Sequence, residues 1–129
     1  MILGVGVDLV DVPRMEKSLK ARWGARFVER VFSDEEIEAC ERTSEPAQSY
    51  AARFAAKEAL VKALGTGFSR GIHPAQIHVR GTERQPPILI LDGRALEAAE
   101  SMQVAHVHLA LTHTDRTACA FVVLEGADL

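Results

Sequence analysis

Cysteine is scarce in this chain, and the two cysteines that it has, Cys40 and Cys119, are widely separated. Neither belongs to a spacing typical of a zinc site or a redox pair, so we expect two free thiols and a reducing, cytoplasmic location. Long hydrophobic runs are also missing, since no stretch approaches the ~20 apolar residues that cross a bilayer. The N-terminus has no basic segment followed by an apolar one, so we expect no signal peptide and no membrane partner.

Internal repeats, low-complexity tracts and an interdomain linker are absent as well. The 129 residues are 47% hydrophobic and 26% charged, a composition typical of a folded globular protein. A chain of this length fits one compact domain, so residues 1–129 are expected to form a single domain. The net charge of −3 argues against general binding to nucleic acid.

Charge is distributed unevenly along the first third of the chain. Residues 12–30 include six basic residues against two acidic ones, and residues 34–45 include six acidic residues against one arginine. The basic residues are Arg14, Lys17, Lys20, Arg22, Arg26 and Arg30. Taken alone, this pattern favours two solvated helix faces whose opposite charges attract and stabilise each other. The alternative is a basic surface that docks an acidic partner.

The first residues alternate in the manner of a β-strand from Ile2 to Asp8. One side of this strand carries Leu3, Val5 and Val7, and the other carries Gly4, Gly6 and Asp8. The two glycines leave their side bare, so another backbone or a ligand can approach it closely. Asp11 or Val12, followed by Pro13, then opens a helical segment that Gly24 interrupts.

The clearest predicted element is a helix from Pro46 to Leu64, rich in strong helix formers and ended by Gly65. A capping box that begins at Ser33 starts a shorter helix before it. After the long helix, the sequence predicts strands at 77–80 and 88–91, the second of them buried, with a turn at 84–87 between them. Asp92 is expected to cap a further helix, and 104–113 with 117–124 to form a hairpin.

Two carboxylates, Asp8 and Glu58, are the residues that could hold a hard cation such as Mg²⁺. The residues alone do not show that the two meet in space. Glu58 and Lys62 lie four apart on the long helix and project from one face, which by itself indicates an ordinary surface ion pair. Asp8 by itself is more typical of a turn or a helix cap.

The histidines and glycines are equally ordinary when taken alone. His106 and His108 share one face of their strand and His113 lies on the other, so no zinc pattern emerges. The segment Gly65-Thr66-Gly67 follows a helix instead of preceding one, which excludes a P-loop and favours a helix cap with a turn.

Taken together, however, these segments form a recognisable combination. Gly4-Val5-Gly6-Val7-Asp8 is followed by Arg14, and Phe54-Ala55-Ala56-Lys57-Glu58-Ala59 is followed by Lys62-Ala63 and Gly65-Thr66-Gly67. The two blocks and their separation resemble the signatures of the holo-acyl-carrier-protein synthase family. Arg30-Val31-Phe32-Ser33 resembles the linking segment, and Thr112-His113 a third block in which serine more often precedes the histidine. The resemblance covers essentially the whole chain.

The resemblance implies an α+β fold of the 4′-phosphopantetheinyl transferase type, a single small domain with mostly antiparallel sheet packed against helices. It also implies an enzyme that transfers 4′-phosphopantetheine from coenzyme A to a serine of apo acyl carrier protein, giving 3′,5′-ADP, for fatty acid biosynthesis. Asp8 and Glu58 would hold Mg²⁺, and Lys62 would contact the pyrophosphate. Either Glu58 or a water on the metal would accept the serine proton.

By the same resemblance, coenzyme A would be bound by Arg53, Lys62, Gly65, Thr66, Pro86 and His113. The family docks its acidic carrier protein on the first helix, and Arg14 matches the family arginine. Lys17, Arg22 and Arg26 extend that surface by charge and helical spacing. Family members of similar length form homotrimers whose active sites lie between subunits.

Two other functions remain open alternatives. One is a Mg²⁺-dependent hydrolase of nucleotides or pyrophosphate that uses the same carboxylates with water as nucleophile. The other is a non-catalytic module that binds carrier protein or coenzyme A. The basic first helix disfavours the hydrolase, and the presence of both Glu58 and Lys62 disfavours the binding module.

Overall fold

A computed structural model describes residues 1–82 and 84–128 of the chain. The first half contains β1 (Ile2–Asp11), α1 (Val12–Lys20), α2 (Gly24–Val31), α3 (Asp34–Glu41) and α4 (Pro46–Leu64). The second half contains the short 3₁₀ helix η1 (Pro74–Gln76), β2 (Ile77–Thr82), β3 (Gln85–Leu91), α5 (Gly93–Ser101), β4 (Val104–His113) and β5 (Thr117–Gly126).

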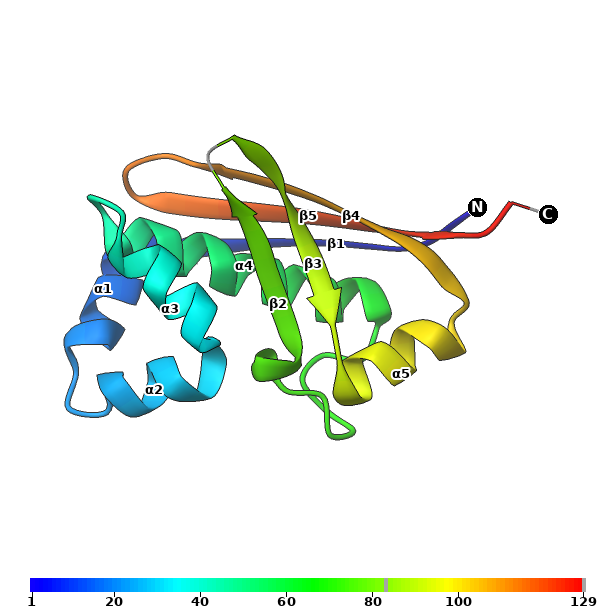
Figure 1. The fold of residues 1–129 in the computed structure, drawn as a ribbon, viewed down its shortest axis with the longest axis horizontal. Coiled ribbons are helices and arrows are strands. Elements are labelled where there is room, and N and C mark those ends of the chain that lie inside the picture. Colours follow the sequence, from blue (N-terminus) through cyan, green and yellow to red (C-terminus); the bar gives the residue numbers. More distant parts are fainter. Residues whose placement is uncertain (83, 129) are drawn as a thin grey trace.

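The strands form two antiparallel sheets. One has the order β1-β5-β4, and the other is the ribbon β2-β3. Figure 1 shows α4 running along the three-stranded sheet, with α1, α2 and α3 gathered at one end and α5 at the other. The predicted α+β fold with mostly antiparallel sheet is confirmed. In the part of the chain that is described, no helix combines the length and apolar character needed to cross a membrane.

The contact between β1 and α4 depends on two glycines. A Cβ atom at Gly4 would collide with the carbonyl oxygen of Ala63, and one at Gly6 would collide with that of Ala59. Since backbone oxygens cannot move aside as a side chain can, only glycine allows the helix to lie this close to the strand. Asp8, the next residue on the same side of β1, is thereby brought to the flank of α4.

Helix α4 has the predicted bounds and forms the centre of the core. Pro46 occupies its first turn, and Gly65 ends it in the left-handed conformation with φ 76°. Its small buried residues, among them Ala55 and Ala59, let both sheets and the N-terminal helices pack around it. The helix is therefore buried on most of its circumference, and its few polar side chains need specific partners.

The N-terminal helices agree with the sequence prediction. The helical segment that starts at Val12 breaks between Lys20 and Gly24, as the glycine indicated. The amide of Glu36 donates to Oγ of Ser33 at 3.2 Å, and the amide of Ser33 donates to Oε1 of Glu36 at 2.9 Å, which completes the capping box.

Two predictions for the β2-β3 ribbon are wrong. The predicted turn at 84–87 is too long, because Gln85, Pro86 and Pro87 already belong to β3. The strand is also less buried than expected, since Ile88 is 53% exposed.

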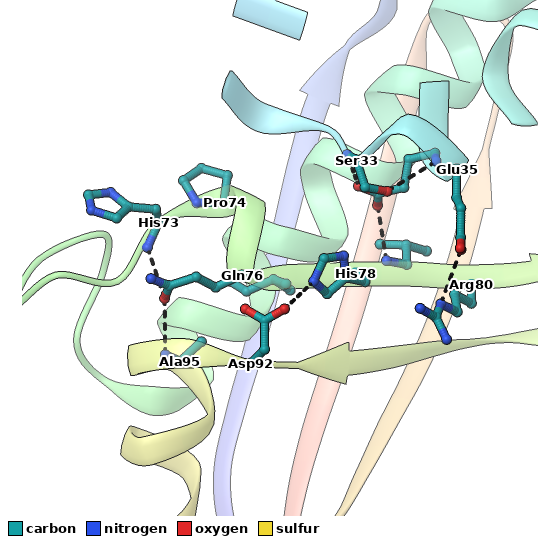
Figure 2. A network of polar contacts seen from close by, with 12 residues as sticks. Ser33, Glu35, His73, Pro74, Gln76, His78, Arg80, Asp92 and Ala95 are labelled. Carbon is teal, nitrogen blue, oxygen red and sulfur yellow. Dashed lines mark hydrogen bonds and ion pairs between the residues drawn. The ribbon is translucent and has the colours of Figure 1, made fainter. Parts of the chain in front are cut away.

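Asp92 stands at the predicted position before α5, but its side chain makes no capping hydrogen bond. Instead it lies 2.7 Å from Nε2 of His78, and Figure 2 shows the two side chains pointing toward each other.

Candidate active site

Asp8 and Lys62 are in direct contact. Nζ of Lys62 donates to Oδ1 of Asp8 at 2.8 Å and to the carbonyl oxygen of Val7 at 3.2 Å. The Asp8 side chain is only 15% exposed, whereas that of Lys62 is 53% exposed. The glycine-lined approach of β1 to α4 thus joins two residues that are 54 positions apart in the chain.

Glu58 lies one helical turn before Lys62 and joins the same group. Burial raises the pKa of Glu58, the negative charge of Asp8 raises it further, and the positive charge of Lys62 opposes both effects. The hydrogen bond and the charge of Asp8 raise the pKa of Lys62. We call these three residues the carboxylate–lysine cluster. The structure brings together the three side chains that the sequence analysis placed in one site.

The donor set of this cluster fits Mg²⁺. Among residues 1–82 and 84–128, no group of three or more His, Cys, Asp or Glu side chains could hold a metal ion. Two neighbouring carboxylates suit magnesium nevertheless, since this ion keeps several waters as ligands and takes the remaining ligands from one or two carboxylates and from substrate phosphates. The mutual repulsion of Asp8 and Glu58 also favours a cation between them, and the ammonium of Lys62 already lies against Asp8.

A second candidate region is a cavity of about 940 Å³ that contains three arginines, Arg42, Arg53 and Arg80. We call it the arginine cavity. Its walls are formed by residues of α3 and the loop after it, the first turns of α4, the end of the β2-β3 ribbon, and the last three residues of β4. Further lining residues are Thr43, Gln48, Ser49, Gly81, Pro87, Leu111, Thr112 and His113.

Arg53 is the residue that most clearly marks this cavity as an anion site. Its Nε atom is buried and has no hydrogen-bond partner among the described residues. A buried donor without a partner is costly, and a phosphate or carboxylate group of a ligand would satisfy it. His113, the last residue of β4, also lines this cavity.

The two candidate regions lie on opposite sides of α4. Nine residues separate Arg53 from Lys62, which is about two and a half turns of an α-helix, so their side chains leave the helix in opposite directions. Lys62 accordingly contacts β1, whereas Arg53 lines a cavity with α3, β2 and β4. One copy of the chain therefore presents two half-sites that face different directions.

The remaining residues of the predicted coenzyme A site lie at the end of α4 and on the ribbon. Gly65 caps the helix shortly after Lys62, and Thr66 follows it. Oγ1 of Thr66 donates to the carbonyl oxygen of Gly67. Neither Gly65 nor Thr66 lines the arginine cavity. Pro86 is exposed and does not line the arginine cavity. Its neighbour Pro87 does line it.

The predicted docking residues are all exposed, but they do not lie on one helix. Arg14 and Lys17 belong to α1, Arg22 lies in the connection, and Arg26 belongs to α2. Trp23, which the sequence analysis did not assign to this surface, is 55% exposed between them. The basic surface is therefore formed by two short helices and the connection between them, which also carries an exposed aromatic side chain. We call it the basic corner.

Comparison with known proteins assigns the chain to a family. Residues 4–122 match the 4′-phosphopantetheinyl transferase superfamily. The chain belongs to this superfamily. A holo-[acyl-carrier-protein] synthase from Syntrophus aciditrophicus is 46% identical over 126 residues, which cover 98% of this chain and 98% of that protein. The synthase from Caulobacter vibrioides is also 46% identical, over 98% of this chain and 97% of its own length.

Solved structures show the same fold as this transferase. The holo-(acyl-carrier-protein) synthase of Bacillus anthracis, in complex with CoA (3′,5′-ADP), is 35% identical and superimposes with a TM-score of 0.79 over 98% of this chain and 99% of its own. The synthase of Neisseria meningitidis is 32% identical, with a TM-score of 0.85 over 97% of this chain and 99% of its own. The family resemblance read from the sequence is confirmed.

Sequence reasoning missed one group of polar residues close to the arginine cavity of this transferase. Lys57 and Glu36 form an ion pair whose side chains are 0% and 1% exposed. The sequence predicts a capping box at Ser33, of which Glu36 is the second member, and it shows Lys57 only as part of the second family motif. The available signal was a lysine inside a run of small apolar residues that face the core, since a buried charge requires a partner.

Proposed function

We propose that this transferase moves the 4′-phosphopantetheine group of coenzyme A onto a serine of an apo acyl carrier protein and releases 3′,5′-ADP. The observation that carries this proposal is the carboxylate–lysine cluster, in which Asp8, Glu58 and Lys62 meet at the glycine-lined contact of β1 with α4. Membership of the superfamily and the holo-[acyl-carrier-protein] synthases among the relatives support it. The product would serve fatty acid biosynthesis in the cytoplasm.

The reaction requires a nucleophile, charge neutralisation and a proton acceptor. The serine hydroxyl oxygen bonds to the β-phosphorus of coenzyme A, the bond from that phosphorus to the bridging oxygen breaks, and 3′,5′-ADP leaves. Such transfers depend mainly on alignment and on neutralising phosphate charge, which Lys62 would do. Glu58, which lies one helical turn before Lys62, would accept the serine proton.

We assign Mg²⁺ to Asp8 and Glu58. When bound, the ion would supply positive charge to the pyrophosphate oxygens. Asp8 and Glu58 repel each other, so a further side chain must hold the two carboxylates close together. The hydrogen bond from Lys62 to Asp8 serves this purpose, since it fixes the Asp8 side chain against α4.

We further propose that the adenosine end of coenzyme A, with its additional phosphate, enters the arginine cavity. Three arginines and the buried, unpartnered Nε of Arg53 suit an anionic group there. His113 and Pro87 provide flatter surfaces on which an adenine ring can rest. Because the carboxylate–lysine cluster lies on the other side of α4, one cofactor molecule would join the half-sites of two neighbouring copies.

A homotrimer with active sites between subunits is consistent with the outer face of the β1-β5-β4 sheet. Val5 and Val7 are each 51% exposed there, and Leu9 and Phe121 are exposed as well. Val7 pairs with Phe121 across the two strands, so these side chains form one continuous apolar surface. Exposed apolar patches of this kind mark interfaces, and a second copy of the chain is the occupant that also completes the site.

The basic corner of α1 and α2 is the proposed docking surface for the carrier protein. Acyl carrier protein is acidic, and Arg14, Lys17, Arg22 and Arg26 present positive charge to it. Contacts of this kind raise the association rate more than the final affinity. Trp23, exposed in the connection between α1 and α2, adds an apolar side chain.

Intact-protein mass spectrometry tests the proposal directly. Apo acyl carrier protein is incubated with coenzyme A, Mg²⁺ and this transferase, and transfer predicts a gain of one phosphopantetheine group on the carrier. Cleavage of coenzyme A without a mass gain would instead indicate a hydrolase. Intact coenzyme A together with unmodified carrier would leave only a binding module.

A further inference from the structure

The buried pair of Glu36 and Lys57 connects three of the elements that form the walls of the arginine cavity, α3, α4 and β2. Nζ of Lys57, on α4, donates to Oε1 of Glu36 at 2.8 Å. Oε2 of Glu36 accepts from the amide of Val79, on β2, at 3.0 Å, while Oε1 also accepts from the amide of Ser33 at the start of α3. One carboxylate thus joins α3, α4 and β2.

The lysine extends this connection to the segment before β2. Besides Glu36, its ammonium contacts the carbonyl oxygens of Val31 at 2.8 Å, Pro74 at 3.0 Å and Ile77 at 2.7 Å. These oxygens belong to the end of α2, to η1 and to the first residue of β2. Four oxygens therefore surround a group that has three protons to donate, and each proton finds an acceptor.

The segments that the pair connects carry the arginines of the cavity. Arg53 lies one helical turn before Lys57 on α4, and Arg80 and Gly81 directly follow Val79 on β2. Ala39 and Arg42 line the cavity from α3 and its C-terminal end, a few residues after Glu36. Figure 2 shows Ser33 at the start of α3 beside β2, and Glu35 reaching across to Arg80.

A second, smaller cavity of about 230 Å³ reinforces the link. Glu36 and Val79 line it together with Arg53, Arg80 and Gly81, so Glu36 shares this cavity with two arginines that also line the larger one. The pair is buried, and burial lowers the pKa of Lys57 while the charge of Glu36 opposes that effect. A pair of charges placed this deep is costly to maintain, and replacing it with apolar residues of similar volume often stabilises a protein.

We propose that Glu36 and Lys57 are positioning residues for coenzyme A: their buried ion pair sets the spacing of the α3, α4 and β2 walls of the arginine cavity. The pair touches no substrate itself. It acts through Arg53 and Arg80, whose guanidinium groups must be held at the right separation to grip one anionic group. This inference rests on the proposed function, since it takes the nucleotide end of coenzyme A as the occupant of the cavity.

The test replaces the pair by apolar residues of similar size, Glu36→Leu with Lys57→Met. The matched control is Arg94→Met with Glu97→Leu, which removes an exposed ion pair of α5 that lies outside both half-sites. We expect the KM for coenzyme A to rise on the order of tenfold in the double variant and to stay unchanged in the control. The kcat at saturating coenzyme A and the KM for carrier protein should stay close to the wild-type values.

A change in the KM for coenzyme A without a change in kcat distinguishes a positioning role from a role in the stability of the fold. A loss of folded protein lowers the apparent kcat and leaves the KM unchanged, so a double variant with a reduced kcat and a wild-type KM for coenzyme A would overturn the proposal. Should the double variant not fold, Glu36→Gln serves in its place, because the amide oxygen can still accept from Val79 while the charge on Lys57 loses its partner. A Glu36→Gln enzyme with wild-type KM would equally overturn it.

Calorimetric titration with 3′,5′-ADP keeps this inference distinct from the transferase assignment. The pair variants should bind 3′,5′-ADP more weakly than the wild-type protein and the control, whether or not transfer occurs. Wild-type protein that binds 3′,5′-ADP but modifies no carrier would refute the transferase while the titration still measures the role of the pair. Equal affinity in all variants would refute the positioning role alone.

Discussion

At the scale of single residues, Asp8 and Glu58 allow the most direct test of the site. Asp8→Asn and Glu58→Gln are each expected to lower kcat by about 100-fold or more, because each removes a negative charge that the bound ion needs. The melting temperature should hardly change for Asp8→Asn, since Asp8 loses only a contact with a half-exposed lysine. The melting temperature of Glu58→Gln should equal or exceed that of the wild-type protein, because burial disfavours the charged carboxylate of Glu58 and the neutral amide avoids this cost.

Steady-state kinetics over a range of Mg²⁺ concentrations, together with thermal melting, checks this prediction. A variant at either position that retained the wild-type rate at limiting Mg²⁺ would show that the carboxylate is not a ligand. Lys62 and Arg53 remain intact in both variants, so binding of 3′,5′-ADP in the arginine cavity should persist and serves as the control for folding.

Tyr50 offers a prediction that depends mainly on burial, with smaller contributions from the charges of Glu41 and Cys40. It is the single tyrosine of the chain and is 3% exposed, and burial raises its pKa to about 12. In the unfolded chain the same group should titrate near ~10. Between these two values the unfolded state loses a proton that the folded state keeps, so stability should fall as the pH rises from about 10 to 12.

Absorbance of tyrosinate reads this titration without interference from a second tyrosine. The native protein should show its transition near the higher pH, and protein in denaturant near the lower one. A native transition near pH 10 would mean that the ring is accessible to water, in contrast to the packing of Tyr50 against Phe32, whose ring centroid lies 4.9 Å away.

At the scale of elements, the contact of β1 with α4 decides whether the carboxylate–lysine cluster forms. Gly6→Ala places a methyl group on the carbonyl oxygen of Ala59, which cannot move without bending the helix. We expect a loss of stability of about 1–3 kcal/mol and a larger relative loss of kcat, because Glu58 and Lys62 move away from Asp8. Denaturant unfolding and steady-state kinetics measure the two effects.

The matched control is Gly126→Ala on β5. There the added methyl group would meet side-chain atoms of Leu3, the nearest at 3.2 Å, and a flexible side chain can adjust. Gly126→Ala should therefore leave kcat unchanged at a small cost in stability. Equal effects of the two substitutions would show that the close approach of strand and helix is not needed.

Elements and site residues were predictable where local chemistry marks them. Helix α4 has a proline at its start, a glycine at its end and helix formers between, so its bounds follow from the sequence. Strand β3 was misjudged because Pro86 and Pro87 usually exclude a strand. In a two-stranded ribbon, however, each strand is an edge, and a proline nitrogen can face away from its partner.

The contact between Glu36 and Lys57 could not be predicted, although both residues lie in segments with a recognisable sequence pattern. They are 21 positions apart, and each had a sufficient local explanation, Glu36 in the capping box and Lys57 in a helix motif. The carboxylate–lysine cluster was equally non-local. It became predictable only because the family motifs tie Asp8 to Glu58 and Lys62, whereas no motif links Glu36 to Lys57.

The docking corner is a property of α1 and α2 together. Arg14→Glu should raise the KM for carrier protein on the order of tenfold and leave the KM for coenzyme A unchanged, since Arg14 lies on α1 and lines neither half-site. The difference in this KM between Arg14→Glu and the wild-type protein should shrink as salt is added, because salt screens exposed charges. Arg94→Glu on α5 is the matched control, and an equal rise for both substrates would contradict docking at this surface.

At the scale of the whole molecule, the direction of the two half-sites determines how many copies of the chain make one active site. Lys62 and Arg53 point to opposite sides of α4, so the cofactor must bridge two copies if both half-sites bind it. Mixing two inactive variants tests this arrangement. One carries Asp8→Asn and Glu58→Gln with an intact arginine cavity, and the other carries Arg53→Ala and His113→Ala with intact carboxylates.

If each active site combines half-sites of two neighbouring copies, random reassembly of a 1:1 mixture restores about a quarter of the wild-type activity, because half of each type of half-site is intact. Reassembly is achieved by unfolding and refolding the two variants together, and the rate of transfer to the carrier is then measured. If each site lay within one copy, every site in the mixture would carry a defect and no activity would return. Adding Val7→Asp to both variants supplies the control, since a charge in the apolar face of the sheet should block assembly and abolish the recovery.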